Sequence, residues 1–259
     1  MTTLDSPRIL VEDASCGYGS RAVLSGCSLD VAPCEVVALI GPNGSGKSTL
    51  MKTVSGAIAP LSGRVSLMGD DVRTLSKKET ARRLGYVPQI ESPAFDFRVR
   101  DVVLMGRFPH SDHLFESRED VIAAEEAMQR ADCDQLAERP MSELSGGEGQ
   151  RVRIARALAQ EAPILLMDEP TTHLDVRHQI DIGLLVRRLA AEGLAVLVAV
   201  HDLNWAAAFA TRVVVLSEGR ILLDGPVEES LESPIIDRAF SVEFQRIREG
   251  GVRLLPVEG

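Results

Sequence analysis

Short runs of apolar, mostly β-branched residues alternate with amphipathic stretches along most of the chain. The apolar runs predict β-strands at residues 9–12, 35–40, 164–167, 195–200 and 212–216. Residues 36–40 and 164–167 are apolar at nearly every position, as expected of strands buried on both faces of a parallel sheet. The alternation of strands and helices therefore predicts an α/β domain with a largely parallel sheet.

Two regions depart from this alternation. Residues 8–30 contain Gly17, Gly19 and Gly26 and predict an antiparallel β-subdomain rather than a βα unit. From residue 92 to 143 helical patterns replace strand patterns, most clearly over residues 119–131. We therefore predict a single domain, composed of an α/β core at 1–91 and 144–225, a helical subdomain at 92–143, and a tail of mixed helix and strand at 226–259.

The composition narrows the classes of function. The 259 residues are 45% apolar and 25% charged, which is ordinary for a globular protein, and the formal charge of -10 argues against a nucleic-acid partner. The four cysteines have no paired or metal-like spacing and are predicted to be reduced thiols. Residues 1–10 lack the apolar core of a secretory signal, and no apolar run approaches the ~20 residues that span a bilayer. A membrane role would therefore require a partner.

A phosphate-binding sequence follows the strand predicted at 35–40. The glycines of this GxxxxGK[ST] sequence let backbone N–H groups turn toward phosphate oxygens at the N-terminus of a helix that begins near Lys47. Lys47 adds a positive charge for the β- and γ-phosphates, and the Ser48 hydroxyl can ligate Mg²⁺. Taken alone, this sequence predicts a P-loop NTPase. The predicted nucleotide-binding residues are Gly41, Pro42, Asn43, Gly44, Ser45, Gly46, Lys47, Ser48 and Thr49.

Two adjacent carboxylates end the buried strand at 164–167, at the edge of the sheet where ligands of parallel sheets bind. Asp168 is placed to hold Mg²⁺ through water. Glu169 is the candidate for orienting or deprotonating an attacking water. With the phosphate loop upstream, these carboxylates predict nucleotide hydrolysis.

A third sequence lies between these two. Residues 144–151 read LSGGEGQR and precede a helical pattern at 152–160, so that Ser145 and Gly147 offer a hydroxyl and an amide at a helix N-terminus. This loop resembles the signature motif of ATP-binding cassette (ABC) proteins. One departure is Gly149, where the family usually has a basic or polar residue; it lowers helix propensity by about 1 kcal/mol and leaves Ser145 and Gly147 in place.

The resemblance extends from about residue 9 to residue 225 and assigns further roles. Tyr18 is similar to the family's adenine-stacking aromatic residue, and Gln89 to the glutamine that senses the γ-phosphate and Mg²⁺. The sequence His173-Leu174-Asp175 is similar to the loop that crosses to the second subunit, and His201 to the histidine that contacts the γ-phosphate and steadies the catalytic glutamate.

The resemblance also implies a mechanism and partners. Two subunits pair head to tail around two ATP molecules, and Ser145 and Gly147 of each act on the nucleotide of the other. Gln89, Glu169 and His201 are the expected catalytic residues, and Ser48, Gln89 and Asp168 the expected Mg²⁺ ligands. A transmembrane permease would hold the ATPase at the cytoplasmic face of the membrane, with a substrate-binding protein involved indirectly.

The segment after Gln89 narrows the subfamily. Residues 100–110 read RDVVLMGRFPH and resemble the corresponding segment of importers for iron chelates (siderophores), haem and cobalamin. Residues 172–175 (THLD) and the tail at 233–242 are also similar to that group, although Ser241 replaces the usual glycine. His110 and His113 are not predicted to bind metal, because no third ligand accompanies them.

Other members of the family remain as alternatives. These are exporters, soluble ABC ATPases of DNA repair or translation, and modules that bind ATP without turnover. Soluble members usually carry a long coiled-coil insertion or two cassettes, and this chain has neither. Glu169 and His201 argue against a module without turnover.

Overall fold

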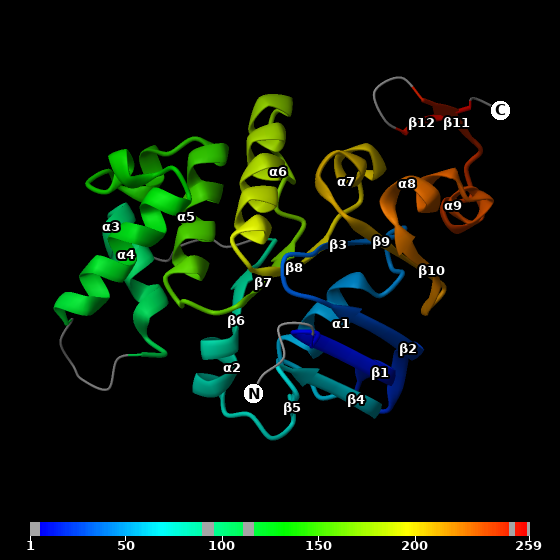
Figure 1. The fold of residues 1–259 in the computed structure, drawn as a ribbon, viewed down its shortest axis with the longest axis horizontal. Coiled ribbons are helices and arrows are strands. Elements are labelled where there is room, and N and C mark those ends of the chain that lie inside the picture. The colour runs from blue at the N-terminus through cyan, green and yellow to red at the C-terminus, as the bar shows by residue number, and fades with distance from the viewer. Residues whose placement is uncertain (1–5, 90–95, 111–116, 249–251, 258–259) are drawn as a thin grey trace.

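A mixed sheet lies at the centre of the computed structural model, which describes residues 6–89, 96–110, 117–248 and 252–257 (Figure 1). Within these residues six strands form it, in the order β10-β9-β3-β8-β7-β6. All neighbours pair in parallel except β10, which is antiparallel to β9. The strands are β3 (Val36–Ile40), β6 (Leu84–Val87), β7 (Ile164–Asp168), β8 (Ala195–Ala199), β9 (Arg212–Ser217) and β10 (Arg220–Pro226). The predicted parallel sheet is confirmed.

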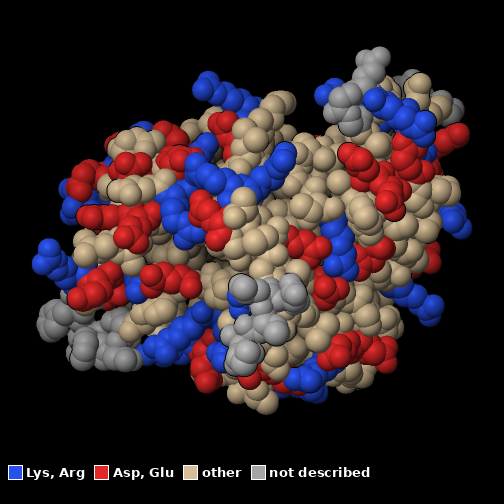
Figure 2. Space-filling model, in the orientation of Figure 1, with Lys and Arg blue, Asp and Glu red and all other residues tan. Residues whose placement is uncertain are grey.

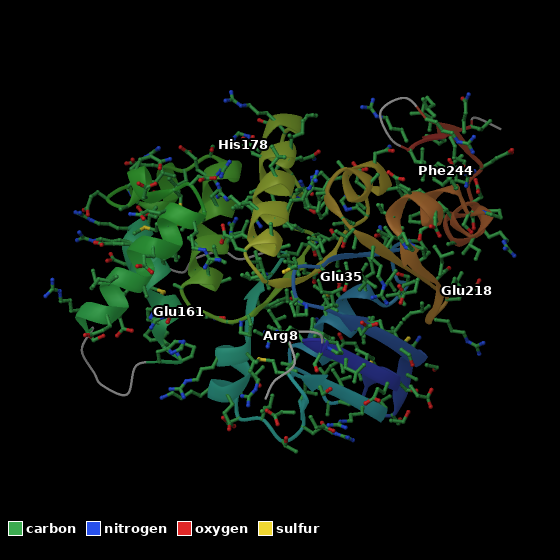
Figure 3. All side chains as sticks on the ribbon, in the orientation of Figure 1. Arg8, Glu35, Glu161, His178, Glu218 and Phe244 are labelled. Atoms are coloured by element: carbon green, nitrogen blue, oxygen red, sulfur yellow. The ribbon has the colours of Figure 1, made fainter. Side chains whose placement is uncertain are left out.

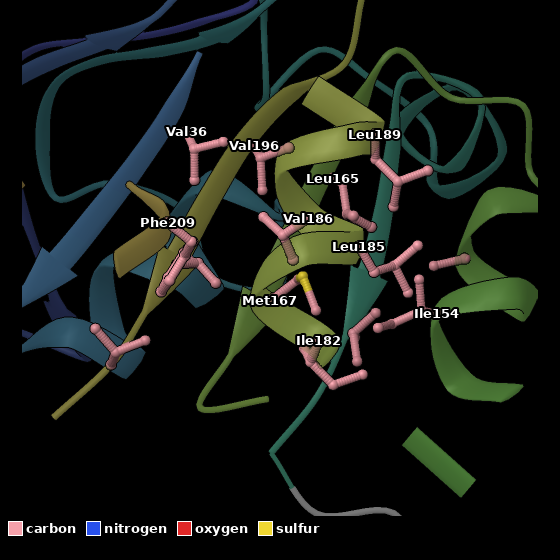
Figure 4. Packing of buried hydrophobic residues seen from close by; sticks show 14 of the residues in the cluster. Val36, Ile154, Leu165, Met167, Ile182, Leu185, Val186, Leu189, Val196 and Phe209 are labelled. Atoms are coloured by element: carbon pink, nitrogen blue, oxygen red, sulfur yellow. The ribbon is translucent and has the colours of Figure 1, made fainter. Parts of the chain in front are cut away.

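Every residue of β3, β7 and β8 is buried, because both faces of the sheet are covered. One face packs against α5 (Gly146–Leu158), α6 (Val176–Ala191) and α7 (Leu203–Phe209). Figure 4 shows this packing, in which Leu165 and Met167 of β7 meet Leu185 and Val186 of α6. Side chains at alternate positions of the same strands point to the other face, where α1 (Lys47–Val54) lies.

The N-terminal region forms a second, antiparallel sheet of the order β2-β1-β4-β5. Its strands are β1 (Ile9–Tyr18), β2 (Arg21–Val31), β4 (Ser62–Leu67) and β5 (Asp70–Asp71). Helix α1 packs between this sheet and the central one, since Leu50, Met51 and Val54 share one core with both. The antiparallel prediction is confirmed, with β1 longer than residues 9–12 because it pairs with β2 as far as Tyr18.

The predicted insertion is helical. It contains α3 (Val99–Leu104) and α4 (Arg118–Arg130), which pack with α5 at one end of the molecule (Figure 1). A capping box between Ser117 and Asp120 begins α4, one residue earlier than predicted. The boundary predicted at 91/92 lies outside the described residues. Helix α2 (Lys77–Arg83) precedes β6.

The tail contains both helices and strands, as predicted. It comprises α8 (Val227–Glu232), α9 (Pro234–Phe240), β11 (Phe244–Ile247) and β12 (Arg253–Pro256). Asn204 of α7 donates to the carbonyl of Leu254 at 3.0 Å and accepts from its N–H at 2.9 Å, which attaches the β11–β12 hairpin to the domain. In the part of the chain that the structure describes, none of the helices has the length and apolar character to cross a membrane.

Candidate active site

The phosphate loop connects β3 to α1, and its glycines are required by close approach and by conformation. Gly41 directly follows β3 and packs closely against β9. A Cβ added to Gly41 would lie 2.1 Å from the carbonyl oxygen of Leu216. Gly46 precedes α1 in a left-handed conformation with φ 109°, where an L side chain is strained. The loop therefore takes a shape that few other residues permit, and the first amides of α1 have no partner within the helix.

Lys47 is buried at 6% exposure and has its ammonium group inside the loop. Its Nζ donates to the carbonyl oxygens of Gly41 at 2.7 Å and Pro42 at 3.2 Å. Burial lowers the pKa of Lys47, while the negative charges of Glu169 and Asp168 oppose that shift. A buried cation at a helix N-terminus is an arrangement suited to phosphate.

Asp168 ends β7 and is 6% exposed. Burial raises its pKa and the charge of Glu169 adds to this, whereas Lys47 and a hydrogen bond with Ser48 act in the opposite direction. Its Oδ1 is buried with no hydrogen-bond partner among the described residues, and the same is true of Ser45 Oγ. A buried carboxylate oxygen without a partner, on an aspartate that also bonds the Ser48 hydroxyl, fits a hard, oxygen-seeking cation such as Mg²⁺.

Three side chains gather around one oxygen of Glu169. Its Oε2 accepts from Gln89 Nε2 at 2.6 Å and from Thr172 Oγ1 at 3.2 Å, and lies 3.7 Å from His201 Nδ1. Glu169 itself has φ 47°, a left-handed conformation that is uncommon outside glycine and is found often at active sites. The three residues predicted to be catalytic are thus brought together.

A cavity of about 260 Å³ opens beside Glu169 and His201. It is lined by residues of the loops that follow β7 and β8 and by one residue of α6: Glu169, Thr171, Thr172, His173, Gln179, Val200, His201 and Asp202. Thr172 was expected only as a subfamily marker, yet its hydroxyl contacts the glutamate directly. The sequence signal that could have indicated this contact is a hydroxyl side chain three residues after the carboxylate.

The signature loop, residues 145–147, forms the beginning of α5. Ser145 is the N-cap, and its Oγ accepts from the N–H of Glu148 while the Glu148 carboxylate accepts from the N–H of Ser145. Helix α5 therefore begins at Gly146, well before the predicted residue 152, despite Gly149. Among the described residues, Gly146 and Gly147 face Leu174 and His178 of their own chain. The structure does not bring the signature loop to the phosphate loop of the same chain.

Tyr18 lies at the end of β1 and is 50% exposed. Lys52 of α1 has its Nζ 3.5 Å from the Tyr18 hydroxyl and 5.9 Å from the ring centroid. The ring is therefore held beside the helix that follows the phosphate loop, with much of its surface exposed.

The remaining candidate chemistry has structural explanations. His110 Nε2 lies 2.7 Å from the carbonyl oxygen of Gln160, and His113 lies outside the described residues. No cluster of three His, Cys, Asp or Glu side chains suited to a metal occurs in the described ranges. Arg151 pairs with Asp132 at 2.9 Å, and acidic and basic side chains are interspersed over the helical region on the face in Figure 2. This is a salt-bridged surface rather than a basic patch.

Comparison with known proteins identifies the family. The family model described as ABC transporter matches residues 24–172, which include the phosphate loop, Gln89, the signature loop and both carboxylates. The chain belongs to the ABC transporter family. The fold class and the family predicted from the motifs are confirmed.

Individual relatives belong to import systems. The cobalamin import ATP-binding protein BtuD of Halobacterium salinarum is 44% identical over 239 residues, which are 92% of this chain and 58% of that protein. The chain thus spans little more than half the length of this relative. The hemin import ATP-binding protein HmuV of Thermobifida fusca is 41% identical over 243 residues, covering 93% of this chain and 85% of the relative.

A solved structure shares the whole architecture. It is described as a metal-chelate type ABC transporter in an inward-facing conformation, and it superposes with a TM-score of 0.86 at 27% identity. The match covers 98% of both chains. The relatives and this neighbour are of the class that residues 100–110 predicted, so the predicted likeness to iron-chelate, haem and cobalamin importer ATPases is confirmed.

Proposed function

We propose that this chain is the ATP-hydrolysing subunit of an ABC importer that energises uptake of an iron chelate, haem or cobalamin through a membrane permease. The observation that carries the proposal is the convergence of Gln89, Thr172 and His201 on Glu169, directly after the buried Asp168. This arrangement supplies a positioned carboxylate beside a site for phosphates.

The roles of the residues follow from their surroundings. Lys47 and the amides at the start of α1 bind the phosphates, so that phosphate oxygens replace the loop carbonyls that Lys47 contacts here. Ser48 and Asp168, with Gln89, would hold Mg²⁺, which neutralises charge on the phosphates when it is bound. Glu169 orients the attacking water and accepts its proton, and His201 contacts the γ-phosphate beside it.

The site requires a second subunit. The signature loop forms the N-terminus of α5, and a helix N-terminus attracts an anion. In a head-to-tail homodimer, Ser145 and Gly147 meet the ATP bound by the partner. Permease subunits hold this dimer at the cytoplasmic face of the membrane, and a substrate-binding protein delivers the cargo to the permease.

The import class is supported by two features. Residues 100–110 resemble those of importers for iron chelates, haem and cobalamin. The relatives named above act in cobalamin and hemin import, and the structural neighbour is of the metal-chelate type. The cargo is therefore expected to be a metal chelate or a metal-bearing tetrapyrrole.

Two experiments test the proposal at separate levels. Glu169→Gln should bind ATP with unchanged affinity and lose turnover, whereas the exposed Glu119→Gln should keep both. Normal turnover by Glu169→Gln would overturn the assignment of the base. Uptake of labelled iron chelate, haem and cobalamin should then be compared between cells with and without the gene. Unchanged uptake of all three would exclude the cargo class and leave the ATPase assignment standing.

A further inference from the structure

His178 of α6 packs against the backbone of the signature loop of the same chain. A Cβ added to Gly147 would lie 1.9 Å from His178 Cδ2 and 2.6 Å from its Nε2. Gly147 is buried, so the imidazole occupies the space in front of it. Next to this contact, a Cβ on Gly146 would lie 3.2 Å from Leu174 Cδ2. Both glycines of the signature loop are thus in contact with the segment 174–178.

The imidazole is held in one orientation. Asp175 Oδ1 accepts from the backbone N–H of His178 at 2.9 Å and lies 2.8 Å from His178 Nδ1. An ionised carboxylate only accepts hydrogen bonds, so Nδ1 carries the proton, and the opposite edge of the ring, at Cδ2, faces Gly147. The hydrogen bonds from His178 hold the pKa of Asp175 below its usual range, which keeps this carboxylate ionised near neutral pH. Figure 3 labels His178 on α6 beside α5.

The other side of the signature loop is fixed independently. Glu148 closes the capping box with Ser145, and Arg139 Nη1 lies 3.3 Å from the Glu148 carboxylate. The loop is therefore held between the capping box on one side and His178 on the other. Because Asp175 belongs to the loop expected to cross to the second subunit, His178 joins that loop to the signature loop within one chain.

We propose that His178 is a positioning residue for the signature loop and sets the direction in which the Gly147 amide meets the ATP of the partner. The inference rests on the proposed function, in which this loop acts in trans. Donors to a phosphate must lie within a few tenths of an ångström of their place, and a misplacement of about 1 Å lowers rates by as much as a hundredfold. His178 touches no ATP in this scheme; it acts through the backbone of Gly147.

The test compares three variants of the full chain with the unmodified protein. His178→Ala should lower kcat for ATP hydrolysis about tenfold or more, while the Kd for ATP at the phosphate loop, measured with the protein dilute and monomeric, stays unchanged. His178→Gln keeps a hydrogen-bond donor and most of the volume, and should recover most of kcat. Arg187→Ala, at an exposed position further along α6, is the matched control and should behave like the unmodified chain.

Three outcomes would overturn the inference. These are an unchanged kcat in His178→Ala, a fall in kcat matched by weaker ATP binding by the monomer, and equal losses in His178→Gln and His178→Ala. The proposed function fails by a different observation. If the unmodified chain does not hydrolyse ATP, or if Glu169→Gln turns over normally, the assignment of the reaction falls before position 178 is examined, and the inference falls with it.

Discussion

Alanine at Gly147 and alanine at Gly149 should change stability in opposite directions, although both glycines lie near the start of α5. A Cβ at position 147 would be 1.9 Å from His178 Cδ2, where ordinary contacts between carbon atoms are about 3.5–4.0 Å. At position 149 the nearest atom is Arg153 Nη1 at 3.8 Å, an ordinary contact. Only the first substitution forces a neighbour to move.

The size of the difference can be estimated because one contribution cancels. Each substitution gains about 1 kcal/mol from the better helix propensity of alanine. Gly147→Ala also overpacks a buried contact, which costs about 1–3 kcal/mol. Gly149→Ala should therefore stabilise the protein by up to about 1 kcal/mol, and the two variants should differ by the overpacking term alone, about 1–3 kcal/mol.

Urea unfolding followed by circular dichroism measures both free energies. Thermal unfolding gives a second measure, because in a protein of this size each 1 kcal/mol of stability shifts Tm by about 2–4 °C. The double variant Gly147→Ala/His178→Ala should recover most of the loss, because the imidazole that obstructs the new methyl group is gone. Equal stability of the two single variants, or no recovery in the double variant, would show that His178 does not pack on Gly147 as described.

Three further predictions test which groups are buried. Arg107→Met should lower the free energy of unfolding by about 3–5 kcal/mol, because it leaves Asp120 buried without its partner, whereas Arg130→Ala breaks a half-exposed pair and should cost at most about 1 kcal/mol. Burial alone would raise the pKa of Asp120, but hydrogen bonds from Ser117 and Arg107 outweigh it and hold the pKa below its usual range. The stability that Asp120 contributes should therefore be complete above its pKa in the unfolded chain, ~3.9. It should disappear as the pH falls through the lower pKa of the folded protein, which urea unfolding at several pH values would measure. A thiol reagent should label Cys34, which is exposed, in the native protein and all 4 cysteines after denaturation; rapid native labelling of more than one thiol would contradict the packing.

The parts of the fold that were predicted from the sequence carry a strong local signal. Strand β7 is apolar and fully buried, and it ends in the two carboxylates, so its pattern predicted both the strand and the site. Strands β4 and β6 are short and contain glycine or polar residues, and they exist because neighbouring strands pair with them. Helix α5 begins earlier than predicted because the Ser145–Glu148 capping box offsets the low helix propensity of three glycines.

The site likewise contains contacts that the sequence indicated and contacts that it did not. The resemblance to ABC proteins assigned Gln89, Glu169 and His201 to one catalytic site, and the structure brings them together at the edge of the parallel sheet where its strands end. The contact between Gly147 and His178 was not predicted, since it depends on how α6 packs beside α5 and neither residue type indicates it alone. The Thr172 contact lies in a local turn, in which the N–H of Thr172 donates to the carbonyl of Glu169 at 3.3 Å and Glu169 has a left-handed backbone. Contacts made by tertiary packing and by strained backbone have no periodic pattern in the sequence.

The segment that indicated the import class is explained by its contacts with the signature helix rather than with a ligand. Gly106 approaches α5 so closely that a Cβ would lie 2.2 Å from the carbonyl oxygen of Arg156. Arg107 donates to the carbonyl of Ala159 at 2.6 Å, which caps the C-terminus of α5 with a buried cation. His110 contacts the next carbonyl, that of Gln160. Arg82 of α2 donates to the carbonyl of Pro109 at 2.9 Å and so attaches the same segment to the helix that precedes β6.

It follows that the GRFPH sequence, residues 106–110, sets how the helix that begins with the signature loop is attached to the rest of the domain. The chain thus fixes α5 at both ends, by Arg107 at its C-terminus and by His178 at its N-terminus. These contacts are made within one chain and reach no ligand, so they carry no information about a cargo. Residues 100–110 could therefore indicate a class of ATPase and not the cargo.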